Sequence, residues 1–255
     1  MLEDFLFYTI HSTLDAPSIN TKQYQFALLS SQQNPKMQNP IPLTIISDFA
    51  CPWCYIGKRR LDEAIGQLPE LDIVIDWQPF QLNPDMPRAG MNRAEYYQQK
   101  FGTEGRRNLF ETLAQAGVES GIVFGNEPEA IAPNTLSAHV LMDWASSDAG
   151  NDTSIDSHAL AEKLFQAHHV ACENIGDHQV LSRISGEVGM NSTDVLAKLK
   201  AGEDEDKVQT QIQQATAQGI SSVPFYIIGE QYALPGAQPA ESLVSAFEQM
   251  VIRDH

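Results

Sequence analysis

Residues 41 to 68 read IPLTIISDFACPWCYIGKRRLDEAIGQL. The run from Leu43 to Phe49 is apolar and β-branched, so it predicts a short buried strand. After Cys51 and Cys54 the apolar residues recur every three or four positions, which predicts an amphipathic helix. Pro52 suits the first turn of that helix, where no backbone N–H is needed. The sequence therefore predicts that a strand delivers Cys51 to the start of a helix, with Cys54 about one turn further in.

This position has chemical consequences for the two cysteines. Free N–H groups and the positive end of the helix dipole favour the anionic form of Cys51. Cys54 follows closely enough to close a disulfide with Cys51. The arrangement predicts that Cys51 attacks a disulfide and that Cys54 releases the captured partner. Pro52 and Trp53 lie between them and tune their reactivity, and Trp53 is also a surface on which partners can stack.

A Cys-X-X-Cys pair is also found in zinc sites, which need four ligands. No second such pair exists here, so the rival site would combine Cys51 and Cys54 with His168 and Cys172. In that interpretation His168 and Cys172 share one helical face. The position of the pair between a strand and a helix favours redox chemistry over metal binding. Cys172 then remains an inert core thiol or a partner for disulfide exchange with Cys51.

Composition restricts the class of protein. The 255 residues are 42% hydrophobic and 19% charged, which is typical of a globular chain. The net charge of −17 argues against nucleic acid or an anionic membrane as a partner. Three cysteines are too few for a disulfide-stapled secreted domain, and Met1 to Pro40 lacks the basic start of a secretory signal. We therefore expect a cytoplasmic protein.

Four segments together resemble a known family: SDFACPWCYIGKRRL (47–61), PNTLSAHVLMDWA (133–145), LFQAHHVACENIGD (164–177) and GISSVPFYIIGEQYALPGAQ (219–238). They resemble the DsbA-like thioredoxin-fold family, and more narrowly its FrnE-type subgroup of intracellular dithiol oxidoreductases. The resemblance implies an α/β chain, a thioredoxin fold with a large all-helical insertion. It implies thiol–disulfide exchange that requires no organic cofactor or metal. Its partners would be disulfide- or thiol-containing proteins or small thiols, and glutathione is a candidate reductant. The chain itself would be a monomer or a homodimer.

The resemblance also assigns roles to further residues. It implies a cis peptide bond between Val223 and Pro224, which turns the Val223 backbone toward the disulfide, where an extended substrate can pair with it. Asn134 would begin a helix that faces the active site, either as a substrate contact or as an ordinary N-cap. Because neither Pro52 nor Trp53 adds charge beside Cys51, we expect a potential more reducing than DsbA's roughly −120 mV.

The chain divides into three parts. Residues 1–40 are predicted to be a poorly ordered N-terminal extension, with Met37 as the natural start and residues 1–36 dispensable. Residues 41–91 and 219–255 are predicted to form the thioredoxin-fold domain. Its second strand, at 71–80, should run parallel to the first, and a hairpin and a closing helix should follow residue 219. Residues 92–218 carry helical spacing and form the inserted helical domain.

Two alternatives remain open. Hydroxychromene-carboxylate isomerases and kappa-type glutathione transferases share the architecture, but there a serine stands where Cys51 is found, and glutathione is bound. The pair Cys51 and Cys54 moves this chain away from those activities without excluding glutathione. The other alternative is a metal-binding or holdase-like interaction protein.

Overall fold

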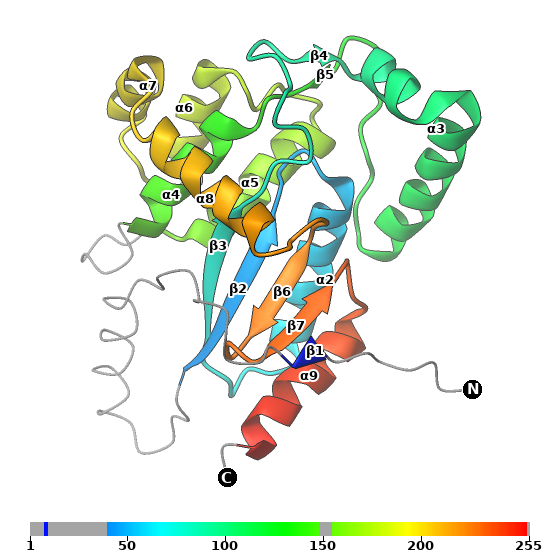
Figure 1. Ribbon diagram of the computed structural model, residues 1–255, viewed down its shortest axis with the longest axis vertical. Coiled ribbons are helices and arrows are strands. Elements are labelled where there is room, and N and C mark those ends of the chain that lie inside the picture. The colour runs from blue at the N-terminus through cyan, green and yellow to red at the C-terminus, as the bar shows by residue number, and fades with distance from the viewer. Residues whose placement is uncertain (1–7, 10–39, 148–154, 254–255) are drawn as a thin grey trace.

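The computed structural model describes residues 8–9, 40–147 and 155–253. Its main sheet has five strands in the order β1-β7-β6-β2-β3 (Figure 1). These strands are β1 (Tyr8–Thr9), β2 (Ile41–Ser47), β3 (Ile73–Pro79), β6 (Phe225–Ile228) and β7 (Tyr232–Pro235). Strand β2 pairs with β3 in parallel and with β6 in antiparallel fashion. The predicted parallel pair and the predicted hairpin of β6 and β7 are both confirmed.

The connection between β2 and β3 is helix α2 (Pro52–Gly66). Strand β2 ends at Ser47, two residues earlier than the apolar run predicted, because the chain turns at Asp48. The backbone N–H of Cys51 donates to the carbonyl oxygen of Asp48 at 3.0 Å in this turn. A parallel neighbour requires a crossover of this kind, and the helix packs its apolar stripe against the sheet.

Most of the remaining chain is helical and lies between β3 and β6. The helices are α3 (Arg93–Glu119), α4 (Leu136–Ser147), α5 (Ser157–His169), α6 (His178–Glu187), α7 (Ser192–Ala201) and α8 (Glu205–Ala217), and α9 (Ala240–Arg253) closes the chain. One prediction was wrong in detail, since the insertion is not all-helical. Strand β4 (Met91–Asn92) pairs with β5 (Ile131–Ala132), which lies within it. The segment after α3 returns to the start of that helix, and strand pairing satisfies its backbone groups.

A single apolar core joins the sheet to the helices. From the sheet and α2 it includes Leu43, Ile56 and Leu61, each 0% exposed, and from α5 it includes Leu164 and Phe165, also 0% exposed. Helix α5 therefore packs onto the same core as the sheet, and it holds the inserted helices against the start of α2.

Helix α3 is attached differently. Its buried residues are only Leu113, Ala116 and Gly117. The helix is interrupted at Gly102, whose φ of 68° and ψ of −178° belong to a region used almost only by glycine. Figure 1 shows α3 as a kinked helix standing apart from the group formed by α4 to α8.

The N-terminal extension is described only at Pro40 and at Tyr8–Thr9, where β1 pairs antiparallel with β7 at the sheet edge. Two predictions otherwise concern residues outside the described ranges: that residues 1–40 are poorly ordered, and that the natural chain starts at Met37. Among the helices that the structure describes, none is long and apolar enough to cross a membrane.

Candidate active site

Cys51 occupies the N-cap position of α2, and Pro52 begins the helix. No side chain caps the first turn. The first-turn N–H groups and the positive end of the helix dipole therefore lie beside the Cys51 side chain. The sequence predicted this placement from the strand–Cys–Pro–helix order, and the structure has it.

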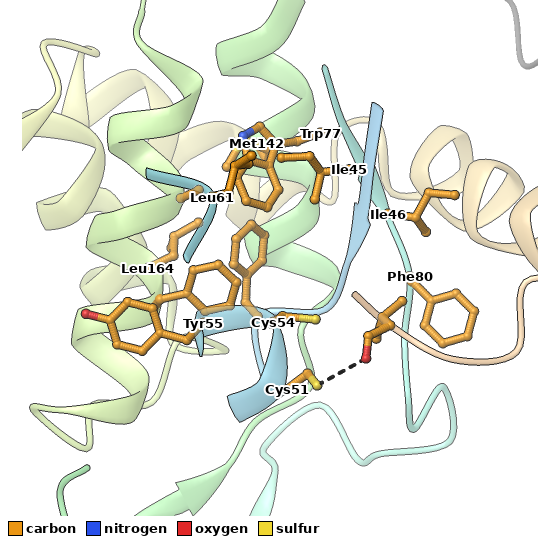
Figure 2. Close-up of a cluster of buried hydrophobic side chains, with 14 of the residues drawn as sticks. Ile45, Ile46, Cys51, Cys54, Tyr55, Leu61, Trp77, Phe80, Met142 and Leu164 are labelled. Atoms are coloured by element: carbon orange, nitrogen blue, oxygen red, sulfur yellow. Dashed lines mark hydrogen bonds between the residues drawn. The ribbon is translucent and has the colours of Figure 1, made fainter. Parts of the chain in front are cut away.

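The loop before β6 lies directly against Cys51. The Val223–Pro224 peptide bond is cis. The Cys51 sulfur lies 3.8 Å from the Val223 carbonyl oxygen, a hydrogen bond drawn dashed in Figure 2. Residues 172 positions apart in sequence thus meet at the thiol. The Val223 carbonyl thus faces Cys51, and its pairing with a substrate stays a prediction.

The Cys54 side chain is almost completely buried. It is 2% exposed and 3.6 Å from Cys51, and both cysteines are free thiols. Burial raises the pKa of Cys54 well above its usual value, and the neighbouring Cys51 raises it further. The hydroxyl of Ser47 and the backbone of Asp48 act in the opposite direction because they stabilise the thiolate. Cys54 is therefore protonated at neutral pH.

Asp48 is a buried carboxylate that the sequence analysis did not single out. It is 1% exposed, and its two oxygens accept hydrogen bonds from the backbone N–H groups of Ala50 (3.2 Å) and Leu82 (2.8 Å). Burial alone would raise its pKa, but His139 and these N–H groups outweigh burial and lower it. The Nε2 atom of His139 is 3.7 Å from Oδ1, longer than a normal hydrogen bond. Asp48 holds the turn that presents Cys51.

Gly57 is a second residue that sequence reasoning missed. A Cβ at this position of α2 would collide with the hydroxyl of Tyr226 and lie 3.0 Å from Cγ of Pro224. The absence of a side chain therefore lets the helix approach the cis-proline loop closely enough to place Val223 against Cys51. A glycine inside a predicted helix is the only sequence signal for this role.

A cavity of about 300 Å³ opens beside Cys51. Its lining includes Trp53 and Leu82 together with Tyr96, Tyr97 and Lys100 of α3. A second cavity of about 630 Å³ adjoins it, and the two share four lining residues, Pro52, Arg93, Tyr97 and His168. Burial lowers the pKa of His168 to about 4, so this imidazole is neutral at pH 7.

Cys172 does not lie on a helical face with His168, contrary to the sequence interpretation. Helix α5 ends at His169, and Cys172 follows in a turn with φ of 58°. Its sulfur lies 3.5 Å from Nη2 of Arg93. Among the described residues no group of three or more His, Cys, Asp or Glu side chains is arranged to hold a metal ion.

Asn134 is placed just before α4. Its Oδ1 accepts a hydrogen bond from the backbone N–H of Leu136 (3.0 Å), and its Nδ2 donates to the carbonyl oxygen of Met86 (2.7 Å). Asn134 therefore precedes the N-cap residue Thr135, whose carbonyl oxygen accepts the first helical hydrogen bond from His139, and it turns the chain into α4. Asn134 does not line the cavity beside Cys51, although Thr135 does.

Comparison with known proteins agrees with this geometry. A family model described as the DSBA-like thioredoxin domain matches residues 43–248. The chain belongs to this family. Members of the DSBA-like family are thiol oxidoreductases or related enzymes, and the fold predicted from the sequence is confirmed. The matches do not separate the FrnE-type subgroup, which stays a prediction.

Individual relatives of this DSBA-like chain are distant. The uncharacterized protein YwbO of Bacillus subtilis (strain 168) is 26% identical over 198 residues, 77% of this chain and 90% of its own length. A probable DsbA oxidoreductase from Streptomyces coelicolor superimposes with a TM-score of 0.72 at 24% identity, covering 82% of this chain and 89% of the other. The cytosolic disulfide reductase DsbM from Pseudomonas aeruginosa gives 0.57 at 16% identity, covering 84% and 100%. Identities this low establish the shared fold alone.

Proposed function

We propose that this protein is a thiol–disulfide oxidoreductase in which Cys51 is the nucleophile and Cys54 the resolving thiol. The observation that carries the proposal is the meeting of three features at one point. These are a cysteine at the start of α2, a second thiol beneath it, and the backbone of Val223 beside a cis-proline. Trp53 and Pro52 line the mouth of the adjoining cavity.

The exchange proceeds in two displacements. The Cys51 thiolate attacks one sulfur of the substrate disulfide, so that a Cys51–substrate disulfide forms and the other substrate sulfur leaves as a thiolate. The Val223 backbone offers a C=O and an N–H group for hydrogen bonds to the part of the substrate next to its disulfide. Cys54 then loses its proton and attacks the Cys51 sulfur. The Cys51–Cys54 disulfide forms, and the second substrate sulfur leaves with the remaining electrons and takes up a proton.

The second displacement is the step that the structure controls most strongly. Cys54 is buried and has a raised pKa, so it must be deprotonated before it can attack. Once Cys51 is joined to substrate its negative charge is gone, and one of the influences that raise the Cys54 pKa is removed. Cys54 therefore loses its proton more easily after capture, when its thiolate is needed for resolution. The oxidised protein returns to the dithiol by exchange with a thiol reductant of the glutathione class.

The test is the pair of variants Cys54→Ser and Cys51→Ser. Cys54→Ser should accumulate a stable mixed disulfide with a model disulfide, visible as an adduct by intact-mass spectrometry. Cys51→Ser should form no adduct and should lose disulfide reduction by at least about 10³-fold. Cys172→Ser is the matched control and should behave as the parent protein. A Cys54→Ser protein that forms no adduct would contradict the proposal.

The reduction potential gives an independent measurement. We expect a value more reducing than about −120 mV, toward the glutaredoxin range of roughly −200 to −230 mV. Equilibration of the dithiol with glutathione redox buffers, read by alkylation, measures it. A value as oxidising as DsbA's would show that Pro52 and Trp53 do not set the potential as argued.

The alternatives make different predictions. A glutathione-dependent isomerase or transferase would bind glutathione tightly and keep its activity in Cys54→Ser, whereas the oxidoreductase would not turn over without Cys54. A holdase-like protein would keep its binding of unfolded chains in Cys51→Ser, whereas a metal site built on Cys51 would lose its metal in that variant. A cytoplasmic location would supply the reducing thiol pool that regenerates the dithiol.

A further inference from the structure

Two adjoining cavities lie between the start of α2 and helix α3, and the smaller one is lined by Cys51. We call the two together the α3 chamber, lined by the residues of the 300 Å³ and 630 Å³ cavities. The four shared residues mark where the cavities adjoin. Whatever reacts with Cys51 from this side must occupy the chamber.

Access to the sulfur restricts the size of the substrate. Cys51 is only 4% exposed. A disulfide fixed on the surface of a folded protein has poorer access to so buried a residue than a small molecule has. A small molecule can reach it, because a volume of about 300 Å³ accommodates a body the size of an aromatic ring with substituents.

The chamber walls are largely aromatic. The lining includes Trp53, Tyr96, Tyr97, Phe101, Phe110 and Phe124. Phe101 and Phe110 remain 41% and 42% exposed, which is unusual for such large apolar side chains. Flat rings in these positions favour a flat or apolar ligand body by stacking and burial.

Positive charge on α3 faces the same space. Within the described part of the chain, Arg93, Lys100 and Arg106 have no carboxylate partner, whereas most other lysines and arginines do. Nζ of Lys100 donates to the hydroxyl of Tyr96 (2.8 Å) and lies 5.8 Å from the centre of the Phe101 ring. Nη2 of Arg93 donates to the carbonyl oxygen of Gly125 (3.0 Å).

The acidic groups of the chamber form no ion pair with these cations. Asp48 lines the smaller cavity as a carboxylate, but its oxygens accept hydrogen bonds from the backbone N–H groups of Ala50 and Leu82, and Glu111 faces Arg107 at 4.0 Å. Glu127 lines only the larger cavity. His168 is neutral at pH 7 and adds no charge. The smaller cavity therefore contains two cations, Arg93 and Lys100, that lack a bound counter-charge.

We propose that the α3 chamber selects small disulfides and thiols that carry an anionic group on an aromatic or similarly apolar body, and that such molecules, rather than folded proteins, are the substrates of Cys51. This inference rests on the proposed function. The overall charge of −17 repels anions at long range. The preference therefore comes from contact with α3 cations inside the chamber rather than from electrostatic steering.

The experiment compares three disulfides reduced by the reduced full-length protein. Dithiobis(nitrobenzoate) carries a carboxylate on each ring, dithiodipyridine is a neutral aromatic disulfide, and insulin presents disulfides in a folded protein. Each second-order rate constant is divided by the rate constant for dithiothreitol, which removes the intrinsic reactivity of the disulfide. We expect the normalised rate to be highest for dithiobis(nitrobenzoate) and lowest for insulin.

Charge variants identify the cause of the preference. Lys100→Glu should lower the ratio of dithiobis(nitrobenzoate) to dithiodipyridine rates by about 2- to 5-fold, the effect expected of a solvent-accessible ion pair. Arg93→Gln should lower it in the same direction. Lys200→Glu on α7 is the matched control, since it makes the same change of net charge on an exposed lysine and should leave the ratio unchanged.

The outcomes separate the two proposals. If the reduced protein reduces none of the three disulfides, the proposed function fails. If it reduces all three in the proportions that dithiothreitol gives, and Lys100→Glu behaves as Lys200→Glu, only the selectivity of the chamber is overturned. A normalised rate for insulin equal to that for dithiobis(nitrobenzoate) would also overturn the preference for small substrates.

Discussion

The frame that carries the thiols and the helix that faces them differ in how they are held. By the frame we mean β2, α2, β3, β6, β7 and α9, whose apolar side chains form much of the core. Helix α3 buries few side chains, is interrupted at Gly102, and keeps Phe101 and Phe110 partly exposed. The reactive groups thus lie on the packed part of the molecule, and the proposed selectivity lies on the loosely packed part. Substitutions in the frame should therefore change stability and the rate of disulfide exchange, whereas substitutions in α3 should change substrate preference.

The largest difference should appear on truncating one large apolar side chain in each region. Leu61 of α2 is 0% exposed, so Leu61→Ala leaves a cavity and should lower the free energy of unfolding by about 2–5 kcal/mol. Phe110 is 42% exposed, and Phe110→Ala should cost less than about 1 kcal/mol. Urea denaturation measures both. Equal losses would show that α3 is as much a part of the core as α2.

A second difference concerns the contact between α2 and the cis-proline loop. Gly57→Ala places a methyl group against Tyr226 and Pro224, and this overpacking should cost about 1–3 kcal/mol. It should also slow disulfide reduction, because the loop that carries Val223 moves away from Cys51. Gly66→Ala in the same helix is the control. Nothing lies within 4 Å of a Cβ there, so stability should rise slightly and activity should stay constant.

A third prediction concerns pH and the ion cluster that joins α2 to α5. Lys58, 5% exposed, lies 2.8 Å from Asp62 and 3.0 Å from Glu162. Burial alone would raise the pKa of both carboxyls, but the contacts with Lys58, and with His158 for Asp62, outweigh it and lower both pKa values. Their stabilisation is therefore present above the unfolded pKa values of about 4 and is lost as pH falls through the lower folded values.

Glu162→Gln tests this linkage. It should cost about 1–2 kcal/mol at pH 7, a partly buried pair being weaker than a fully buried one. The difference from the parent should shrink as the pH of the unfolding measurement is lowered below about 4. Glu111→Gln on α3, where the ion pair is largely exposed, should change stability at neither pH. A Glu162→Gln difference that persists in acid would contradict the assignment.

The smallest effect on the free energy of global unfolding is expected at the interruption of α3. Gly102→Ala introduces a side chain where the backbone conformation suits glycine, at a cost of about 1–3 kcal/mol, but no neighbouring atom lies within 4 Å. Because α3 contributes little to the core, the cost should appear as faster amide hydrogen exchange in residues 93–105 rather than as a change in global unfolding. Faster exchange in β2 as well would show that α3 and the frame open together.

Local patterns predicted much of this molecule. The periodicity of residues 61–68, the prolines and the spacing of the two cysteines indicated a strand, a helix start and a dithiol. Strand β2 ends two residues before the predicted end at Phe49, because hydrogen bonding in the turn at Asp48, rather than apolar character, ends the strand. The segment HHVAC was extrapolated as helix, but α5 ends at His169, and this changed the position of Cys172.

The sequence by itself determined which sulfur begins a helix and which sulfur follows one turn later. Both positions depend on residues that are adjacent in the chain, and they define the dithiol chemistry. Only the tertiary structure decided the surroundings of those sulfurs. The burial of Cys51, the buried carboxylate of Asp48, the bare surface of Gly57 and the cations of α3 depend on contacts between distant segments. Periodicity describes how one element faces its neighbours, and it carries no information about which side chains those neighbours present.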